Sequence, residues 1–222
     1  MWLEESMKKG KRMKDHHKVG DIDIYIKDQL PEDIDASFVF DYISSRVPFY
    51  LLGGIEVIYV GSFPEMKKRD IEAFYEDEAI YITNEQESEM EMVESLIHEI
   101  SHALEQRQME TIYDDGNLES EFLAKRRRLA QLLSQKYMLP EGFETDHSYR
   151  RDIDIFLYET VGYEALGQIC VGIFPSAYAA TSISEYWAKG FEELFLGDKN
   201  DFKELCPILY NKMINVIEIL KE

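Results

Sequence analysis

The first third of the chain is patterned like β-strands separated by turns. Four segments have apolar residues at alternate or successive positions over the length of a strand: residues 21–26, 54–60, 71–75 and 79–83. The last two segments flank an acidic turn at residues 76–78, so they predict a hairpin. Residues 31–47, between the first two strands, predict a helix that starts near residues 33–37 and ends before Pro48.

From residue 88 onward, the apolar positions follow the 3.6-residue period of amphipathic helices. The predicted helices are residues 88–106, 118–137, 158–171, 184–196 and 207–221. Residues 138–152 are polar and predict a flexible loop. Strands therefore precede helices, which predicts an α+β fold rather than a doubly wound α/β fold: a small N-terminal mixed sheet over residues 20–84, then a helical C-terminal half over residues 88–222.

The length of 222 residues fits one domain, and we expect residues 20–222 to form it. Residues 1–19 are basic and predict a loosely ordered leader. The whole chain is acidic, with 24 basic and 44 acidic residues and a net charge of −20. This charge predicts that neither nucleic acid nor a membrane surface is a partner, and it favours peptide or protein partners with basic residues. The alternative is that the acidity serves only solubility.

The sequence also predicts where the chain resides. It has no apolar run of the length of a membrane span, and the leader lacks the apolar segment of a secretory signal peptide. The two cysteines, Cys170 and Cys206, are too far apart for a CxxC redox pair or a zinc knuckle. We therefore expect a reduced, cytoplasmic location in the producing cell, with secretion by a non-standard route left open.

The candidate chemistry begins with the HExxH motif His98-Glu99-Ile100-Ser101-His102. On a helix, histidines four residues apart lie on one face and can bind one metal ion, while the adjacent Glu99 can act as general base on a metal-bound water. The apolar stripe of the same helix consists of Val93, Leu96, Ile97, Ile100, Ala103 and Leu104. Both histidines fall nearly opposite this stripe, so they are not core residues; surface histidines remain the alternative.

A catalytic zinc site needs a third protein ligand and an open position for water. The remaining histidines do not complete an HExxHxxGxxH pattern; they are His16, His17 and His147. A glutamate is therefore expected, and two compete. Glu121 follows His102 by 19 residues, a spacing shared with one large group of HExxH peptidases, but it can also pair with Lys125 on a solvated helix. Glu185 lies farther on, where Ser182 can form a capping box with it.

The segment from Tyr178 to Phe191, YAATSISEYWAKGF, bears on this choice. Together with the HExxH motif, it resembles the catalytic domain of anthrax lethal factor and the related Pro-Pro endopeptidases. That family pairs an early HExxH with a distant glutamate that is followed by two aromatic residues, an alanine and a later phenylalanine. A tyrosine seven residues before the glutamate assists catalysis there. The resemblance covers roughly residues 79–220.

The resemblance implies a zincin-like metallopeptidase domain with Zn²⁺ held by His98, His102 and Glu185, and with catalytic roles for Glu99 and Tyr178. Two positions depart from the family pattern. Ser101 stands where glycine is common, and Lys189 stands where the family has an acidic residue that orients the ligands. Glu192 and Glu193 are the candidates to replace that acidic residue.

Three further expectations concern the surroundings of the site. The strand at residues 79–83 is expected to be an edge strand that pairs with an extended substrate, with an ordinary edge strand as the alternative. Trp187 and Phe191 are expected in the core. The basic run at residues 125–128 is expected to form a solvated face that neutralises nearby carboxylates.

The sequence therefore predicts a zinc-dependent endopeptidase that uses metal-activated water and Glu99 as general base. The first alternative is a catalytically inactive zinc-binding module of the same fold with a regulatory or interaction role, which the Lys189 departure favours. The second is an interaction domain without metal.

Overall fold

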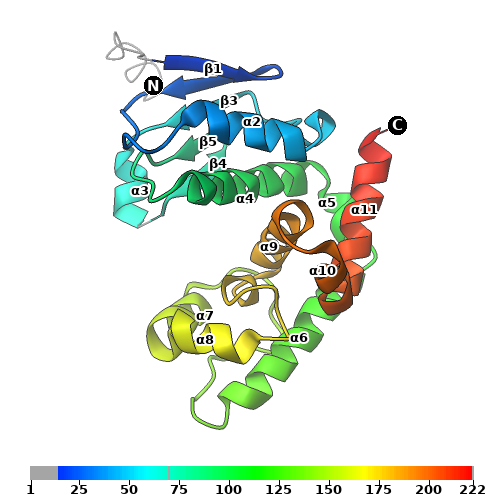
Figure 1. Cartoon of the computed structure of the whole chain (residues 1–222). Coiled ribbons are helices and arrows are strands. Elements are labelled where there is room, and N and C mark those ends of the chain that lie inside the picture. The colour runs from blue at the N-terminus through cyan, green and yellow to red at the C-terminus, as the bar shows by residue number, and fades with distance from the viewer. Residues whose placement is uncertain (1–14, 70, 222) are drawn as a thin grey trace. The chain divides into compact units, whose positions relative to one another are not determined.

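The computed structural model describes residues 15–69 and 71–221 (Figure 1). The contacts divide the chain into two compact units, one ending at Leu104 and the other beginning at Glu105. Helix α4 (Glu89–Arg107) is continuous through this boundary. The first unit contains the strands and the second is helical, so the predicted order of a mixed sheet followed by helices is confirmed.

The first unit is built on a five-stranded mixed sheet with the order β1-β2-β3-β5-β4. Its strands are β1 (Asp15–Val19), β2 (Ile22–Ile26), β3 (Val57–Val60), β4 (Ala73–Glu76) and β5 (Ala79–Ile82). The inner pairs β2–β3 and β3–β5 are parallel, whereas β1 and β4 pair antiparallel at the two edges. The described residues of this unit also form α2 (Ala36–Arg46), a short 3₁₀ helix (Phe49–Leu51), α3 (Pro64–Arg69) and most of α4.

Aliphatic and aromatic residues alternate along the inner strands. Ile24, Ile58 and Ile80 are aligned with one another and are at most 4% exposed. The next residues along these strands, and the residue of β4 paired with the last of them, form an aromatic row: Tyr25, Tyr59, Tyr81 and Phe74. Their ring centroids are 5.8, 5.3 and 4.7 Å apart in that order. Because side chains alternate between faces, the isoleucines and the aromatic row lie on opposite faces of the sheet.

The predicted hairpin is confirmed, but the predicted edge strand is wrong. Strands β4 and β5 pair antiparallel, and the two residues between them, Asp77 and Glu78, have φ angles of 50° and 62°, as a tight two-residue hairpin turn requires. However, β5 lies between β3 and β4, so both sides of its backbone are paired. All four of its residues are buried, which is typical of an inner strand. The edge on this side of the sheet is β4.

The predicted helix before Pro48 is confirmed as α2, whereas part of the predicted loose leader forms a strand, β1. The Asp35 side chain accepts a hydrogen bond from the backbone N–H of Ser37 at 2.9 Å and caps α2, which ends before Pro48 as expected. Of the predicted leader, residues 1–14 lie outside the described residues. Its last five residues form β1, in which Val19 is buried and His16 and Lys18 are exposed, so the strand has little of the apolar alternation that marks a strand in sequence.

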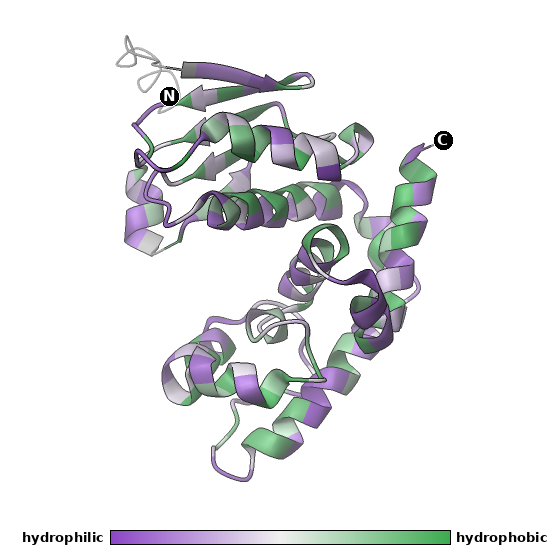
Figure 2. Cartoon of the chain, viewed as in Figure 1, coloured by the Kyte–Doolittle hydropathy of each residue, from purple (hydrophilic) through white to green (hydrophobic). Residues whose placement is uncertain are grey.

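The second unit consists of helices and their connections. After the end of α4, its helices are α5 (Met109–Tyr113), α6 (Asn117–Leu133), α7 (Arg151–Ile155), α8 (Tyr163–Cys170), α9 (Ile183–Leu196), α10 (Lys199–Leu205) and α11 (Pro207–Lys221). The helix predicted at 158–171 is divided at Gly162, with a π-helical turn at Phe156–Val161 before it. Figure 2 shows hydrophobic and hydrophilic residues mixed along the longer helices, as their amphipathic pattern requires.

Helix α9 forms much of the core of the second unit. Trp187 is fully buried and Phe191 is 1% exposed, which confirms both as core residues. A side chain in place of Gly190 would bring its Cβ to 2.4 Å from Leu209 of α11. The glycine therefore permits α9 and α11 to pack closely. A bilayer-spanning helix is absent from the described part of the chain, where every helix is too short or too polar.

The basic run at residues 125–128 is only partly solvated, which corrects the expectation from sequence. Arg126 is fully buried, and its guanidinium lies 5.3 Å from the ring centre of Phe122 and 4.4 Å from that of Phe143. One of its nitrogens donates to the Asp146 carbonyl at 3.4 Å, and its Nε and Nη2 have no hydrogen-bond partner among the described residues. Burial lowers the pKa of Arg126 to about 10. Its inward position follows from Phe122, which lies one helical turn earlier on the same face.

Arg126→Met should stabilise the protein. The pKa of Arg126 lies below its ordinary value in the folded state, so its charge opposes folding at neutral pH. Replacing it with an apolar side chain of similar length should raise the free energy of unfolding by about 1–2 kcal/mol, measured by urea denaturation at pH 7. Arg127→Met, at an exposed neighbouring position, is the control and should change stability by less than about 0.5 kcal/mol. A loss of stability in Arg126→Met would contradict this account.

Candidate metal centre

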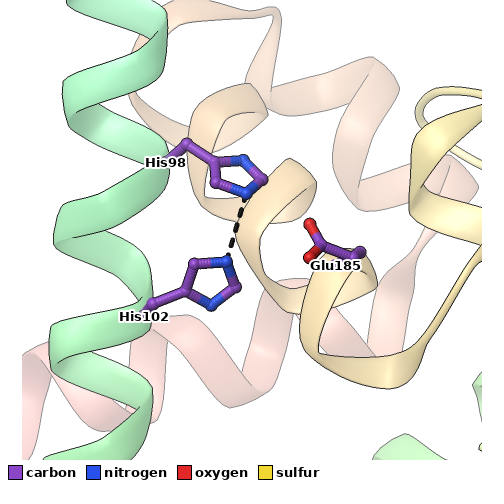
Figure 3. A group of neighbouring side chains, drawn as sticks. All are labelled: His98, His102 and Glu185. Carbon is purple, nitrogen blue, oxygen red and sulfur yellow. Dashed lines mark hydrogen bonds between the residues drawn. The ribbon is translucent and has the colours of Figure 1, made fainter. Parts of the chain in front are cut away.

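The two histidines of the HExxH motif lie on α4, whose ends suit a stable helix. Acidic residues occupy its first turn and Arg107 its last, which complements the helix dipole. The Nε2 atoms of His98 and His102 are 3.1 Å apart, with the ring planes at 78° (Figure 3). Two nitrogens bound to one tetrahedral zinc ion at its usual bond length would be about 3.3 Å apart. The pair therefore has the spacing that zinc needs.

Two polar residues lie between these histidines, and both are buried. Glu99 is 7% exposed and directly follows His98. Ser101 is fully buried, and its hydroxyl donates to the His98 carbonyl oxygen at 2.6 Å. The helix thus accommodates serine at the position where the lethal-factor family commonly has glycine, because the hydroxyl has a partner on the preceding turn.

Glu185 lies in the first turn of α9, and the start of this helix is held by its neighbours. Ser182 is the N-cap, as its place in the predicted capping box requires, and its hydroxyl accepts a hydrogen bond from the backbone N–H of Glu185 at 3.2 Å. The backbone N–H of Ile183 donates to the His147 carbonyl at 2.8 Å. A carboxylate in the first turn is also favoured by the helix dipole.

His98, His102 and Glu185 form a group that is able to hold a metal ion. Each offers one ligand atom, and these three atoms all lie within 4.8 Å of one another (Figure 3). All three side chains are partly buried. Within residues 15–69 and 71–221, it is the one such group of three or more histidine, cysteine or acidic side chains. Two imidazole nitrogens and one carboxylate oxygen are one of the donor sets of catalytic zinc sites, which keep a fourth position open.

The competing glutamate, Glu121, has other partners. Its Oε1 accepts from the backbone N–H of Ile208 at 3.0 Å, and its Oε2 accepts from that of Leu209 at 3.0 Å and from the Tyr186 hydroxyl at 2.9 Å. Glu121 therefore caps the N-terminus of α11 and is absent from the metal-binding group. The alternative pairing with Lys125 is also wrong, because the Lys125 ammonium donates to two backbone carbonyls at 2.7 Å.

Tyr178, the predicted catalytic tyrosine, begins a short 3₁₀ turn (Tyr178–Ala180) and is 36% exposed. Burial raises its pKa above the ordinary value, and the negative charge of Glu185 adds to this effect. The hydroxyl is therefore protonated at neutral pH and available as a hydrogen-bond donor. The ring of Tyr163 packs edge to face on Tyr178, with the centroids 6.2 Å apart.

Other tyrosines lie near Tyr178 that the sequence does not single out. The Tyr149 hydroxyl donates to Asp154 at 3.0 Å, and the Tyr158 ring lies 5.5 Å from that of Tyr163. Burial raises the pKa of Tyr163, and the charges of Asp154 and Glu185 raise it further. With 14 tyrosines in the chain and no fixed spacing among these, the sequence carried no signal that would single them out.

The other departure from the family pattern, Lys189, is part of an ion pair. Its ammonium lies 2.9 Å from a carboxylate oxygen of Glu192, one turn later on α9. The three histidines outside the motif are not in the metal-binding group. His16 lies 2.8 Å from Asp23 and His147 lies 3.1 Å from Glu119, while the ring of His17 packs beside Phe40.

No family model, no curated protein and no solved structure matches this chain. The resemblance to the lethal-factor family therefore rests on the two motifs themselves.

Glu185→Ala should weaken zinc binding far more than Glu121→Ala does. Loss of a ligand should raise the Kd for Zn²⁺ by more than the roughly 10–100-fold that changes around the ligands cost. Glu121→Ala should instead lower the free energy of unfolding by about 1–2 kcal/mol, because it removes a helix cap, and leave zinc affinity unchanged. Chelator competition and urea denaturation measure the two quantities. The reverse order of zinc affinities would remove Glu185 from the ligand set.

Proposed function

We propose that this protein is a zinc-dependent endopeptidase with a zincin-like catalytic domain. The observation that carries the proposal is the grouping of one ligand atom each from His98, His102 and Glu185 within 4.8 Å, with an acidic residue directly after the first histidine. Zinc bound there would supply a Lewis acid that lowers the pKa of a water ligand towards about 7 and polarises a peptide carbonyl.

Glu99 is the proposed general base. Its carboxylate accepts a proton from the attacking water and then passes this proton to the leaving amine. The side chain is 7% exposed and is carried on the same rigid helix as both histidines, so its position relative to them is fixed by the helix itself. Such fixed placement avoids an ordering cost when substrate binds.

Tyr178 is the proposed donor to the oxyanion that develops on the peptide carbonyl. Its raised pKa keeps the phenol protonated, as a donor must be, and the contact with Tyr163 restrains the ring. Donors of this kind contribute about 3–4 kcal/mol to transition-state stabilisation in other enzymes.

The substrate backbone is proposed to add to the sheet at β4. This strand replaces β5 in that role, because β4 is the edge strand and pairs with one neighbour only. An extended peptide would then lie beside the sheet of the unit that carries the HExxH motif. The net charge of −20 favours substrates with basic residues.

A second candidate is a zinc-binding module of the same fold that lacks peptidase activity and serves regulation or interaction. The observation in its favour is Lys189, which pairs with Glu192 where the resembling family has an acidic residue. Zinc binding without cleavage of any member of a peptide library would favour this candidate. An interaction domain without metal predicts no zinc in the purified protein and no change in melting temperature when zinc is added.

Glu99→Gln should abolish peptide hydrolysis and leave zinc bound. Glutamine keeps the size of the side chain but cannot accept the proton from water. The measurement is digestion of a peptide library, read by mass spectrometry, together with the zinc content of wild type and variant. Hydrolysis by the Glu99→Gln variant at the wild-type rate would exclude Glu99 as the general base.

Tyr178→Phe should lower kcat by roughly 100-fold, with little change in zinc content, because it removes one oxyanion donor. Tyr158→Phe is the matched control, since Tyr158 is exposed and belongs to the same group of tyrosines. Steady-state kinetics on the best library peptide gives both values. Equal kcat in wild type and Tyr178→Phe would show that the hydroxyl plays no part in the reaction.

A further inference from the structure

Helix α4 carries a second acidic residue on the face of the metal-binding histidines. Glu105 follows His98 by seven residues and His102 by three, and both intervals return to the same side of a helix. It is 8% exposed. A carboxylate buried to this extent requires hydrogen bonds, since a buried charge without them is costly.

Two hydrogen bonds to Glu105 come from two other helices. The Ser184 hydroxyl of α9 donates to Glu105 Oε2 at 2.6 Å, and the Tyr113 hydroxyl of α5 donates to Oε1. Burial and the Glu105 charge raise the pKa of Tyr113, so this phenol stays protonated as a donor. Glu105 thus joins the last turns of α4 to α5 and to the start of α9.

Ser184 directly precedes Glu185, the proposed metal-binding carboxylate. The first turn of α9 is therefore held at three successive residues: Ser182 caps the helix, Ile183 donates to the His147 carbonyl, and Ser184 donates to Glu105. The first two contacts fix where the helix begins. The third comes from the helix that bears the histidines, and it restrains the rotation of this turn about the helix axis.

We propose that Glu105 is a positioning residue of the metal centre: through the Ser184 hydroxyl it orients the turn that presents Glu185 to the metal held by His98 and His102. This role rests on the proposed function, because it requires those three residues to bind one ion. Neither Glu105 nor Ser184 belongs to the ligand group itself. Hydrogen bonds around metal ligands commonly change metal affinity by 10–100-fold when they are removed.

The experiment compares Ser184→Ala and Glu105→Gln with Ser120→Ala as a matched control. Ser120 also donates a helical hydroxyl hydrogen bond, but to the Gly116 carbonyl of its own helix at 2.8 Å. Three properties are measured: the Kd for Zn²⁺ by chelator competition, the visible absorption spectrum of the Co²⁺-loaded protein, and the melting temperature of the metal-free protein.

We expect Ser184→Ala and Glu105→Gln to bind Zn²⁺ about tenfold or more weakly than wild type and to alter the Co²⁺ spectrum. Ser120→Ala should leave both unchanged. Ser184→Ala should stay folded but melt a few degrees lower than Ser120→Ala without metal, because the buried Glu105 carboxylate loses one donor. If Glu105→Gln does not fold, the Ser184→Ala comparison decides alone. An equal loss of zinc affinity in Ser120→Ala would assign the effect to general destabilisation and overturn the proposal.

Two other outcomes separate this inference from the proposed function. Wild-type protein that binds Zn²⁺, together with Ser184→Ala and Glu105→Gln variants of equal affinity and unchanged Co²⁺ spectra, would overturn the role of Glu105 and leave the zinc site intact. Wild-type protein that binds neither Zn²⁺ nor Co²⁺ would remove the zinc site, and the role of Glu105 with it.

Discussion

The candidate chemistry depends on the rigidity of one helix. Over the 19 residues of α4, the fixed rise and rotation of the backbone determine the relation among His98, Glu99, His102 and Glu105 before any ligand arrives. Two imidazoles, the proposed base and a buried carboxylate are thus carried on one element. This helix supplies two imidazoles from one side only, and the third residue of the group that could hold a metal ion, Glu185, is on α9.

Much of the secondary structure was predictable because its signals are local. The alternation in β2, the acidic turn between β4 and β5, and the helical period of α4, α6, α9 and α11 each lie within a short stretch of sequence. The sequence does not predict the four described helices of five to seven residues, namely α3, α5, α7 and α10, because they are shorter than two helical turns and show no period. The order of the strands in the sheet could not be predicted from the sequence either. Whether β5 lies at an edge depends on its pairing with β3, and no residue of β5 encodes that pairing alone.

The candidate site also combines residues that local sequence identifies with residues that it does not. The HExxH motif identifies His98, Glu99 and His102 from local spacing, whereas Glu185 is indicated by resemblance because it lies 83 positions after His102. The role of Glu121 was hidden for a related reason. Its partners are the first backbone N–H groups of α11, more than 80 residues away, and only the proline at the start of that helix marks the place in sequence. The burial of Arg126 was equally invisible, since a cation in a basic run is normally solvated.

The aromatic row across the sheet helps to specify the register in which the strands pair. Each of four neighbouring strands contributes one ring, so a strand shifted by one position would turn its ring to the isoleucine face and leave an aliphatic residue in its place in the row. A strand in the wrong register would therefore lose side-chain packing on both faces of the sheet. Only six residues separate the end of β5 from the beginning of α4. Correct strand alignment therefore also determines where the helix with the HExxH motif starts, so the stacked rings help to set the location of the histidines.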